Sequence, residues 1–263
     1  MKIKSLGIGI CLSLFGTFCL GGCSGSSPQP VSRTVTVFDT VVTITVYDKD
    51  SEDVLDACVA KCEDYNAQFS RLRIQKLNRI SINPHILISD MTFRFLNPEA
   101  AIDLGGIAKG YIADQLKAYL KEQNVSHALI NLGGNVLALD GKPDGSDYNI
   151  GIQKPFAQNG EAITSVKIKD QSVVSSGIYE RYFKVGDKIY HHILDPKTGY
   201  PYKNNLLGVS IVCDSSTEAD ALSTTCFAMG LDDGLKYIEG IKGAEALFIT
   251  DDYEIHYYSG FPK

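Results

Sequence analysis

Along much of this chain, hydrophobic and polar residues alternate with the period of β-strands. In four stretches they follow the period of an α-helix. Alternating β-branched residues over 34–48 predict a strand pair or one long bent strand. Further strand patterns stand at 86–89, 92–95, 127–140 with a break at Gly133-Gly134, 148–153, 163–169, 172–176, 246–250 and 254–258. Helical spacing marks 51–69, 108–123, 216–230 and 232–239. Strands in runs with few helices favour an α+β body with mostly antiparallel sheet and flanking helices.

The first 23 residues carry a different pattern. Lys2 and Lys4 precede an apolar run that ends in Leu20-Gly21-Gly22-Cys23. The run is short for a membrane-spanning helix, and small residues just before a cysteine are typical of a lipoprotein signal, which is cleaved before that cysteine. We therefore expect Cys23 to carry lipid on its sulfur, and an ordinary secretory signal peptide is the alternative.

This interpretation divides the chain into three parts. Residues 1–22 are expected to be the signal peptide, 23–33 a Ser- and Pro-containing lipidated tether, and 34–263 one compact domain. The domain is then expected on the extracytoplasmic face of the cell membrane, held there by its lipid.

Charge and cysteine usage narrow the class of partner. The chain has 25 basic and 31 acidic residues, a net charge of −6, which becomes −8 when Lys2 and Lys4 leave with the signal peptide. An anionic surface argues against nucleic acid and against a polybasic membrane contact. The domain keeps Cys58, Cys62 and two later cysteines without zinc-ligand spacing, and we expect buried free thiols.

A paired glycine stands at the entry to the helix expected over 108–123. In AIDLGGIAKGYIADQL, Gly105 and Gly106 precede the helical pattern directly. Glycines at a helix start let the backbone pass close to a ligand, often to phosphate oxygens, which the helix N-terminus also attracts. The alternative is a helix start that only needs a tight turn.

The helix expected over 216–230 carries a candidate metal site. Ser215 with Glu218 three residues later is a capping-box signature, so Asp220 lies in the first two turns and Thr224 returns to the same face. A carboxylate and a hydroxyl on one face suit a hard divalent ion that keeps room for phosphate oxygens. The alternative is an aspartate that only favours the helix dipole.

Two histidines precede a tight turn in HHILDPKTGYP. Their position at a strand end suits proton transfer near neutral pH, although one of them is expected to be only a hydrogen-bonded strand residue. The chain has no GxxxxGK[ST], HExxH or GxSxG motif, which disfavours a P-loop kinase, a zincin and an α/β-hydrolase.

Five stretches, taken in order, resemble the ApbE family of FAD:protein FMN transferases from about Phe38 to Phe248. They are DLGGIAKGYIAD (103–114), INLGGN (130–135), SSGIYERYF (175–183), HHILDPKTGYP (191–201) and STEADALSTTCFAMG (216–230). The resemblance implies a T-fold-like body that binds FAD with Mg²⁺ and moves FMN onto a threonine hydroxyl of a flavoprotein, with AMP leaving.

The resemblance also assigns roles to residues. It implies His192 as the base on the threonine, and a backbone oxygen near Gly106 with Asp220 and Thr224 as magnesium ligands. Its implied FAD contacts are Phe38, Asp103, Gly105, Gly106, Lys109 and Ile193.

The family usually has a longer stretch with a Ser-x-Gly-x-Phe-Asp segment where this chain is shortened, between about 70 and 100. A non-transferring FAD-binding lipoprotein or an FAD pyrophosphatase therefore stays open beside the transferase, as does a purely binding or structural module. The acceptors that the resemblance implies are FMN-binding subunits of membrane redox complexes of the Rnf or Na⁺-translocating quinone reductase type.

Overall fold

The computed structural model describes residues 29–74, 86–89, 92–95, 103–157, 160–258 and 260–261, and between 70 and 102 it gives only the backbone course of the elements. The helices are α1 (Glu52–Ile74), α2 (Ala108–Glu122), α3 (Ser216–Met229) and α4 (Leu231–Glu239). The strands are β1 (Val31–Val37), β2 (Thr40–Val46), β3 (Ile86–Ser89), β4 (Thr92–Phe95), β5 (Ala128–Leu132), β6 (Asn135–Leu139), β7 (Tyr148–Gln153), β8 (Ala162–Ile168), β9 (Ser172–Gly177), β10 (Tyr182–Val185), β11 (Lys188–His191), β12 (Leu206–Cys213), β13 (Ala244–Thr250) and β14 (Ile255–Tyr257).

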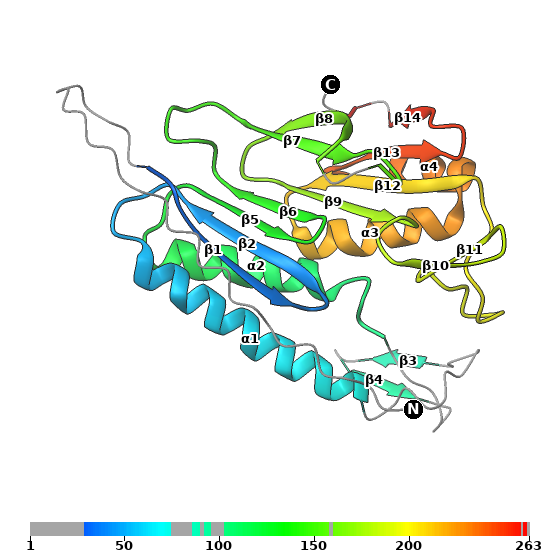
Figure 1. Cartoon of the computed structure of the whole chain (residues 1–263), viewed down its shortest axis with the longest axis horizontal. Helices are drawn as coiled ribbons and strands as arrows, with labels where there is room; N and C mark the ends of the chain where they lie inside the picture. Colours follow the sequence, from blue (N-terminus) through cyan, green and yellow to red (C-terminus); the bar gives the residue numbers. More distant parts are fainter. Residues whose placement is uncertain are drawn as a thin grey trace.

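Eight of the described strands form one sheet in the order β1-β2-β5-β6-β9-β12-β13-β14, and each neighbouring pair is antiparallel. Helices α1, α2 and α3 lie along one side of this sheet, and the β7–β8 hairpin lies on the other (Figure 1). The β10–β11 pair is a separate two-stranded ribbon. The α+β fold with a mostly antiparallel sheet is confirmed.

The middle of the sheet is buried on both faces, whereas β1 and the start of β2 leave side chains such as Thr34 and Val41 exposed. One core cluster joins α1 and α2 to β1, β2 and β5, and a second joins α3 and α4 to β9, β12 and β13. A third fills the space under the β7–β8 hairpin. Neighbouring residues divide between the faces, because successive side chains of a strand point to opposite sides: Val174 belongs to the second cluster and Val173 to the third.

Strand β12, an interior strand of the sheet, is not among the strands that the sequence patterns predict. All eight of its residues are buried. Its sequence LLGVSIVC is a nearly continuous apolar run instead of an alternating one, which is typical of a strand covered on both faces. The alternation rule therefore failed at the strand where the sheet is most completely enclosed.

The first strand begins at Val31, three residues before the position at which the domain was expected to start. Ser32 and Thr45 share a hydroxyl hydrogen bond of 2.8 Å, and Arg33 forms a 2.6 Å ion pair with Asp56 of α1. These contacts hold residues 31–33 against β2 and α1. Cys23 and the expected signal peptide lie outside the described residues, as does most of the shortened region between 70 and 100.

One smaller expectation has also been tested on the described residues. The cysteines at 58, 62, 213 and 226 are free and buried, as expected. Burial raises the pKa of the Cys58 thiol to about 12, which keeps it protonated and unreactive at neutral pH. Among the helices that the structure describes, none has both the length and the hydropathy needed to cross a membrane.

Candidate functional site

The candidate site lies where α2 and α3 pack against each other as antiparallel neighbours. Ordered contacts fix their register: Gly106, just before α2, lies next to Thr224, Gly110 next to Asp220, and Asp114 next to the start of α3 at Ser216. A Cβ on Gly110 would come within 2.2 Å of the Ser216 carbonyl oxygen. Glycine is therefore required at this position for the two helices to approach so closely.

Asp220 binds the N-terminus of α2. Its Oδ2 accepts a 2.9 Å hydrogen bond from the amide of Gly110, and the amide of Lys109 also donates to this carboxylate. Helix α2 has no side-chain cap of its own at Ile107, so Asp220 supplies one from the neighbouring helix. The expected alternative, in which Asp220 acts only on the dipole of its own helix, is therefore wrong about which helix it stabilises.

The carboxylate of Asp220 is nearly fully buried, with 3% of the residue exposed. Burial raises its pKa, and the charge of Lys109 and the amides of α2 act in the opposite direction. A buried carboxylate of this kind gains if a cation joins it, because the added charge compensates for lost hydration.

Asp114 of α2 performs the reciprocal capping for α3. Its carboxylate accepts hydrogen bonds from the amides of Ser216 and Thr217 at 2.9 Å each, and from the hydroxyls of Thr217 and Ser215 at 2.6 and 3.1 Å. Ser215 itself accepts from the amide of Glu218, which confirms the capping-box start of α3. Each helix therefore caps the other. This fixes the positions of Asp220 and Thr224 relative to the turn at Gly105-Gly106 before α2, here called the glycine turn.

Gly106 and Thr224 meet at the end of the helix pair near the glycine turn. A Cβ on Gly106 would lie 3.3 Å from Thr224 Oγ1, so the glycine leaves the hydroxyl beside bare backbone. Ser176 of β9 holds the hydroxyl from the other side at 3.1 Å. Asp220 and Thr224 thus lie on the same face of α3, as expected, and that face meets α2 and the glycine turn.

Lys109 is the cation at the centre of the site. Its Nζ donates a 3.3 Å hydrogen bond to the Gly133 carbonyl of the NLGG segment. Its charge acts on Asp220, on Glu180 and on His192. Burial raises the pKa of Glu180, while Lys109 and Arg181 lower it. Residues of the NLGG segment, of Tyr179-Glu180-Arg181 (here called the YER segment) and of α3 therefore interact with one lysine.

The two adjacent histidines have different roles. His191 is buried, donates from Nε2 to the Tyr202 carbonyl at 3.2 Å and accepts at Nδ1 from the Ile193 amide at 3.3 Å. Its ring also packs edge-on against Phe227. Both of its ring nitrogens are occupied, so His191 is the hydrogen-bonded structural histidine that the sequence anticipated.

His192 is exposed and keeps one ring nitrogen available. Its Nδ1 lies 3.2 Å from the Arg181 carbonyl oxygen, which can only accept, so Nδ1 carries the hydrogen and Nε2 of the neutral ring holds the lone pair. Partial desolvation of the ring lowers its pKa, the hydrogen bond to the Arg181 carbonyl acts in the opposite direction, and the charges of Arg181, His191 and Lys109 lower the pKa further. His192 is therefore a neutral base at pH 7.

Two other predicted FAD contacts have clear positions. Asp103 accepts a 2.7 Å hydrogen bond from the Gly105 amide and shapes the glycine turn. Phe38 stands at the β1–β2 turn with φ of +55°, where its amide is held by Asn66 and its carbonyl by Arg181. The structure places Phe38 near the YER segment, although the two lie far apart in sequence.

Ile193 is the predicted FAD contact with the least freedom. Its side chain is buried in the second core cluster, and its amide and carbonyl are bonded to His191 and Tyr202. The structure thus gives Ile193 a packing role, and its contact with FAD stays a prediction.

Sequence reasoning missed Asp114, Ser176, Glu180 and Arg181 as site residues. All four lie in the motif stretches or directly beside a motif glycine, so the motifs contained the signal. Arg181, for example, reaches across the molecule to donate a 3.0 Å hydrogen bond to Phe38. Their roles depend on contacts between distant segments, which motif spacing does not reveal.

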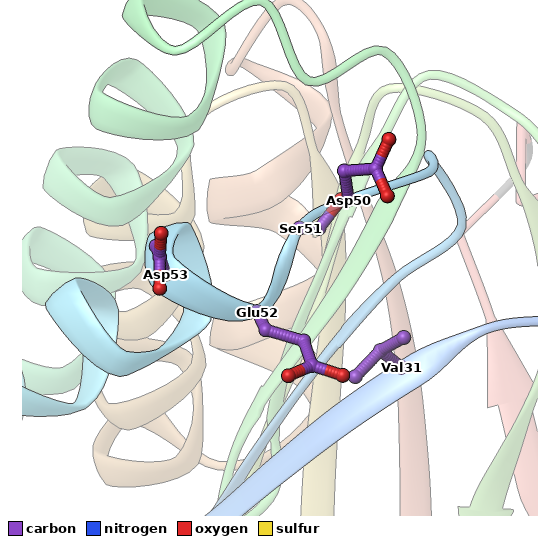
Figure 2. A pocket seen from close by; sticks show the side chains of 5 residues that line it. All are labelled: Val31, Asp50, Ser51, Glu52 and Asp53. Carbon is purple, nitrogen blue, oxygen red and sulfur yellow. The ribbon is translucent and has the colours of Figure 1, made fainter.

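A separate hollow of about 450 Å³ opens near the start of α1, lined by Val31, Asp50, Ser51, Glu52 and Asp53 (Figure 2). Residues 47 and 48 here bond to residues 126 and 127, just beyond the C-terminal end of α2, whereas the glycine turn lies at the N-terminal end. Three acidic side chains repel a phosphorylated ligand. This hollow is not the candidate site.

The fold and the site define a protein that presents helix N-terminal amides, a lysine and oxygen ligands at one point, an arrangement suited to a phosphorylated ligand. A model of the ApbE family matches residues 73–248, and the chain belongs to this family.

Relatives and solved structures agree with that assignment. The chain is 44% identical to an FAD:protein FMN transferase of Klebsiella pneumoniae and 38% identical to one of Treponema pallidum, in each case over 60% of this chain. It spans about half the length of these curated relatives, 48% and 46%.

Two solved structures share the fold. The ApbE protein of Thermotoga maritima superposes with a TM-score of 0.76 over 89% of this chain and 100% of the other, at 23% identity. The flavin transferase ApbE of Vibrio cholerae gives a TM-score of 0.70 over 89% and 98%, at 20% identity. At these identities the likeness concerns the fold alone.

Proposed function

We propose that this protein transfers FMN from FAD to a threonine hydroxyl of an acceptor flavoprotein, releasing AMP, with Mg²⁺ bound at the site. The observation that supports this most directly is the convergence of the glycine turn, Asp220, Thr224, Lys109 and His192 at the α2–α3 junction. The names of the similar proteins point to the same reaction.

The residues present fit a magnesium ion. The donor set is one buried carboxylate from Asp220, the hydroxyl of Thr224 and the backbone beside Gly106, all oxygen. Mg²⁺ prefers oxygen ligands and is often held by only one or two carboxylates together with substrate phosphates. The described residues hold no cluster of three or more His, Cys, Asp or Glu side chains, which agrees with a site completed by phosphate. When bound, Mg²⁺ would neutralise charge on the pyrophosphate and ease the departure of AMP.

Each protein group then has a defined task. Lys109 attracts the pyrophosphate through its positive charge, and the positive end of the α2 dipole lies at the same point. His192 Nε2 takes the proton of the threonine hydroxyl as its oxygen attacks the FMN phosphorus. The bond from that phosphorus to the bridging oxygen breaks, and AMP leaves with this oxygen. The protein contributes mainly position and charge, as is usual for phosphoryl-type transfer.

We also propose a location and a class of partner. The signal pattern before Cys23 supports a lipid anchor on the extracytoplasmic face of the cell membrane. Acceptor subunits of the Rnf or Na⁺-translocating quinone reductase type would be reachable from there. The net charge of −6 supports the expectation that nucleic acid is not a partner.

The test is to incubate the full-length protein, purified in detergent, with FAD, Mg²⁺ and an FMN-binding subunit of such a complex. Covalent flavin is then detected by in-gel fluorescence and AMP by chromatography. Labelled acceptor with equimolar AMP supports the transferase. Free FMN and AMP without labelled acceptor would establish the pyrophosphatase instead. Binding of FAD without any product would leave only an FAD-binding protein.

A further inference from the structure

The β10–β11 ribbon presents an uncovered face beside His192. In the antiparallel register, Phe183 pairs with Tyr190 and Val185 with Lys188, so these four residues share one face, here called the outer face. Phe183 is 62% exposed and Val185 59% exposed. The rings of Phe183 and Tyr190 stack at 5.2 Å, almost parallel. The outer face is thus an ordered aromatic surface open to solvent.

The opposite face of the ribbon contacts the body of the protein through Tyr182 and His191, which fixes the direction of the outer face. Tyr182 packs against Phe156 at 5.3 Å between ring centroids. His191 packs against Phe227 of α3 at 5.8 Å. Because side chains alternate along a strand, these contacts turn Phe183 and Tyr190 away from the body of the protein. In Figure 1 the ribbon is drawn beside α3 and outside the eight-stranded sheet.

The charge around the ribbon differs from that of the whole chain. Residues 181–203 contain five basic residues and two acidic ones, whereas the chain has 25 basic and 31 acidic residues. Lys188 lies on the outer face itself, and Lys184 is exposed on the opposite face of the same ribbon. A basic aromatic surface on an acidic protein favours a partner with acidic and apolar side chains.

The outer face is also continuous with the candidate base. His192 directly follows β11, and both its amide and its Nδ1 are bonded to the Arg181 carbonyl, just before β10. His192 therefore stands at the inner end of the ribbon. Lys188 is four positions from His192 along the chain, about 13 Å along an extended strand.

We propose that the outer face of the β10–β11 ribbon, formed by Phe183, Val185, Lys188 and Tyr190, docks an extended segment of the acceptor protein. The segment places its threonine at His192, lays an apolar side chain on the stacked rings, and sets an acidic side chain against Lys188. At about 3.4 Å per residue, that acidic side chain stands about four residues from the threonine. The proposal rests on the proposed transferase function and names how its second substrate is recognised.

The experiment compares two variants of the outer face with two matched controls. The variants are Lys188→Glu and the double variant Phe183→Ser with Tyr190→Ser. The controls are Lys236→Glu and Tyr237→Ser on α4, where both side chains are exposed and far from the ribbon in sequence. Each full-length protein is assayed for FMN transfer over a range of acceptor concentrations, and separately for FAD binding by quenching of flavin fluorescence.

The expected result is a rise of about tenfold or more in the KM for acceptor in both outer-face variants, because removal of central aromatic or charged contacts dominates binding loss. FAD binding stays at the parental value in all four proteins, and the controls transfer normally. For Lys188→Glu, the difference from the parent shrinks in high salt, since exposed charges are screened. Replacing the acidic residue near the acceptor threonine by its amide raises KM for the parent but adds little for Lys188→Glu.

Other outcomes overturn the proposal in separate ways. Parental transfer by both outer-face variants would remove the docking role and leave the transferase function intact. If the parent itself transfers no FMN, the proposed function fails, and binding of the labelled acceptor is then measured alone. The docking proposal is refuted if the parent and the outer-face variants bind the acceptor equally, or if neither binds it. A variant that loses binding to vesicles with anionic phospholipid, or loses self-association, while keeping acceptor binding would assign the face to a membrane or to a second copy.

Discussion

The reciprocal caps of α2 and α3 provide a matched pair of substitutions that separates folding from chemistry. Asp220 caps α2 and Asp114 caps α3, and both are buried at least in part against amides of the neighbouring helix. Replacing either by asparagine keeps the shape and one acceptor oxygen but removes the charge. Only Asp220 stands beside Thr224 and the glycine turn, so only Asp220→Asn should affect the metal.

The stability change expected for Asp114→Asn follows from its four donors. An amide oxygen still serves Ser216 or Thr217, but the amide nitrogen then faces a remaining donor. Loss of such a cap costs about 1–2 kcal/mol, including the weakened interaction with the helix dipole. For a folded body of this size, that corresponds to a melting temperature lower by about 2–8 °C.

Asp220→Asn should cost less. Burial raises the pKa of Asp220, so its ionised form is held at some expense, and a neutral amide oxygen still accepts from Gly110. We expect a change in the free energy of unfolding of within about 1 kcal/mol. The loss of an anionic ligand, by contrast, removes several kcal/mol of charge stabilisation in the transition state, which is at least about a hundredfold in rate.

The assay measures thermal unfolding by circular dichroism and FMN transfer as a function of Mg²⁺ concentration for both variants. Asp114→Asn should melt earlier and keep its Mg²⁺ dependence, whereas Asp220→Asn should melt close to the parent and lose Mg²⁺-dependent transfer. The reasoning is refuted if Asp220→Asn transfers FMN at the parental rate with an unchanged Mg²⁺ requirement. It is also refuted if Asp114→Asn, once folded, loses activity as completely as Asp220→Asn.

Further predictions concern the histidines, the helix contact and the anchor. His192→Ala should abolish transfer while leaving FAD binding nearly unchanged. The parental rate should rise with pH, with a midpoint below 6.5, because the pKa of His192 is lowered and its neutral form is the base. Transfer at the parental rate by His192→Ala, or a greater loss in His191→Ala, would contradict this assignment. Burial lowers the pKa of His191, so below about pH 6.5 this histidine binds a proton more readily in the unfolded chain than in the folded one. The free energy of unfolding should therefore fall as the pH drops below that value. In chemical denaturation, His191→Phe should flatten this part of the pH profile. Gly110→Ala should destabilise the fold by about 1–3 kcal/mol, because the added methyl meets the backbone of Ser216, and an unchanged melting temperature would count against the register of α2 and α3. Cys23→Ser should release the protein from membranes in cell fractionation, and retention after a carbonate wash would disprove the lipid anchor.

Much of the fold was accessible from local patterns. The β1–β2 pair, the helices at 108–122, 216–229 and 231–239, and the final hairpin follow from periodicity and capping residues close in sequence. The exceptions are informative. Strand β12 could not be predicted from alternation, because a strand buried on both faces has apolar residues at nearly every position. The β10–β11 ribbon could not be predicted because its strands are short and carry exposed aromatic side chains.

The chemical groups of the site can be recognised in the sequence alone: paired glycines before a helix, an aspartate and a threonine four positions apart, a lysine, and two histidines before a turn. Residue type and spacing within one helix or turn are local properties, so they can be read without coordinates. How these groups meet depends on the tertiary structure. Asp220 caps a helix that begins 112 positions earlier in the chain, at Ala108. His191 is locked while His192 keeps a free nitrogen, because the surrounding carbonyls and amides come from other segments. Those contacts depend on the packing of the sheet and helices as a whole, and no single stretch of sequence contains both partners.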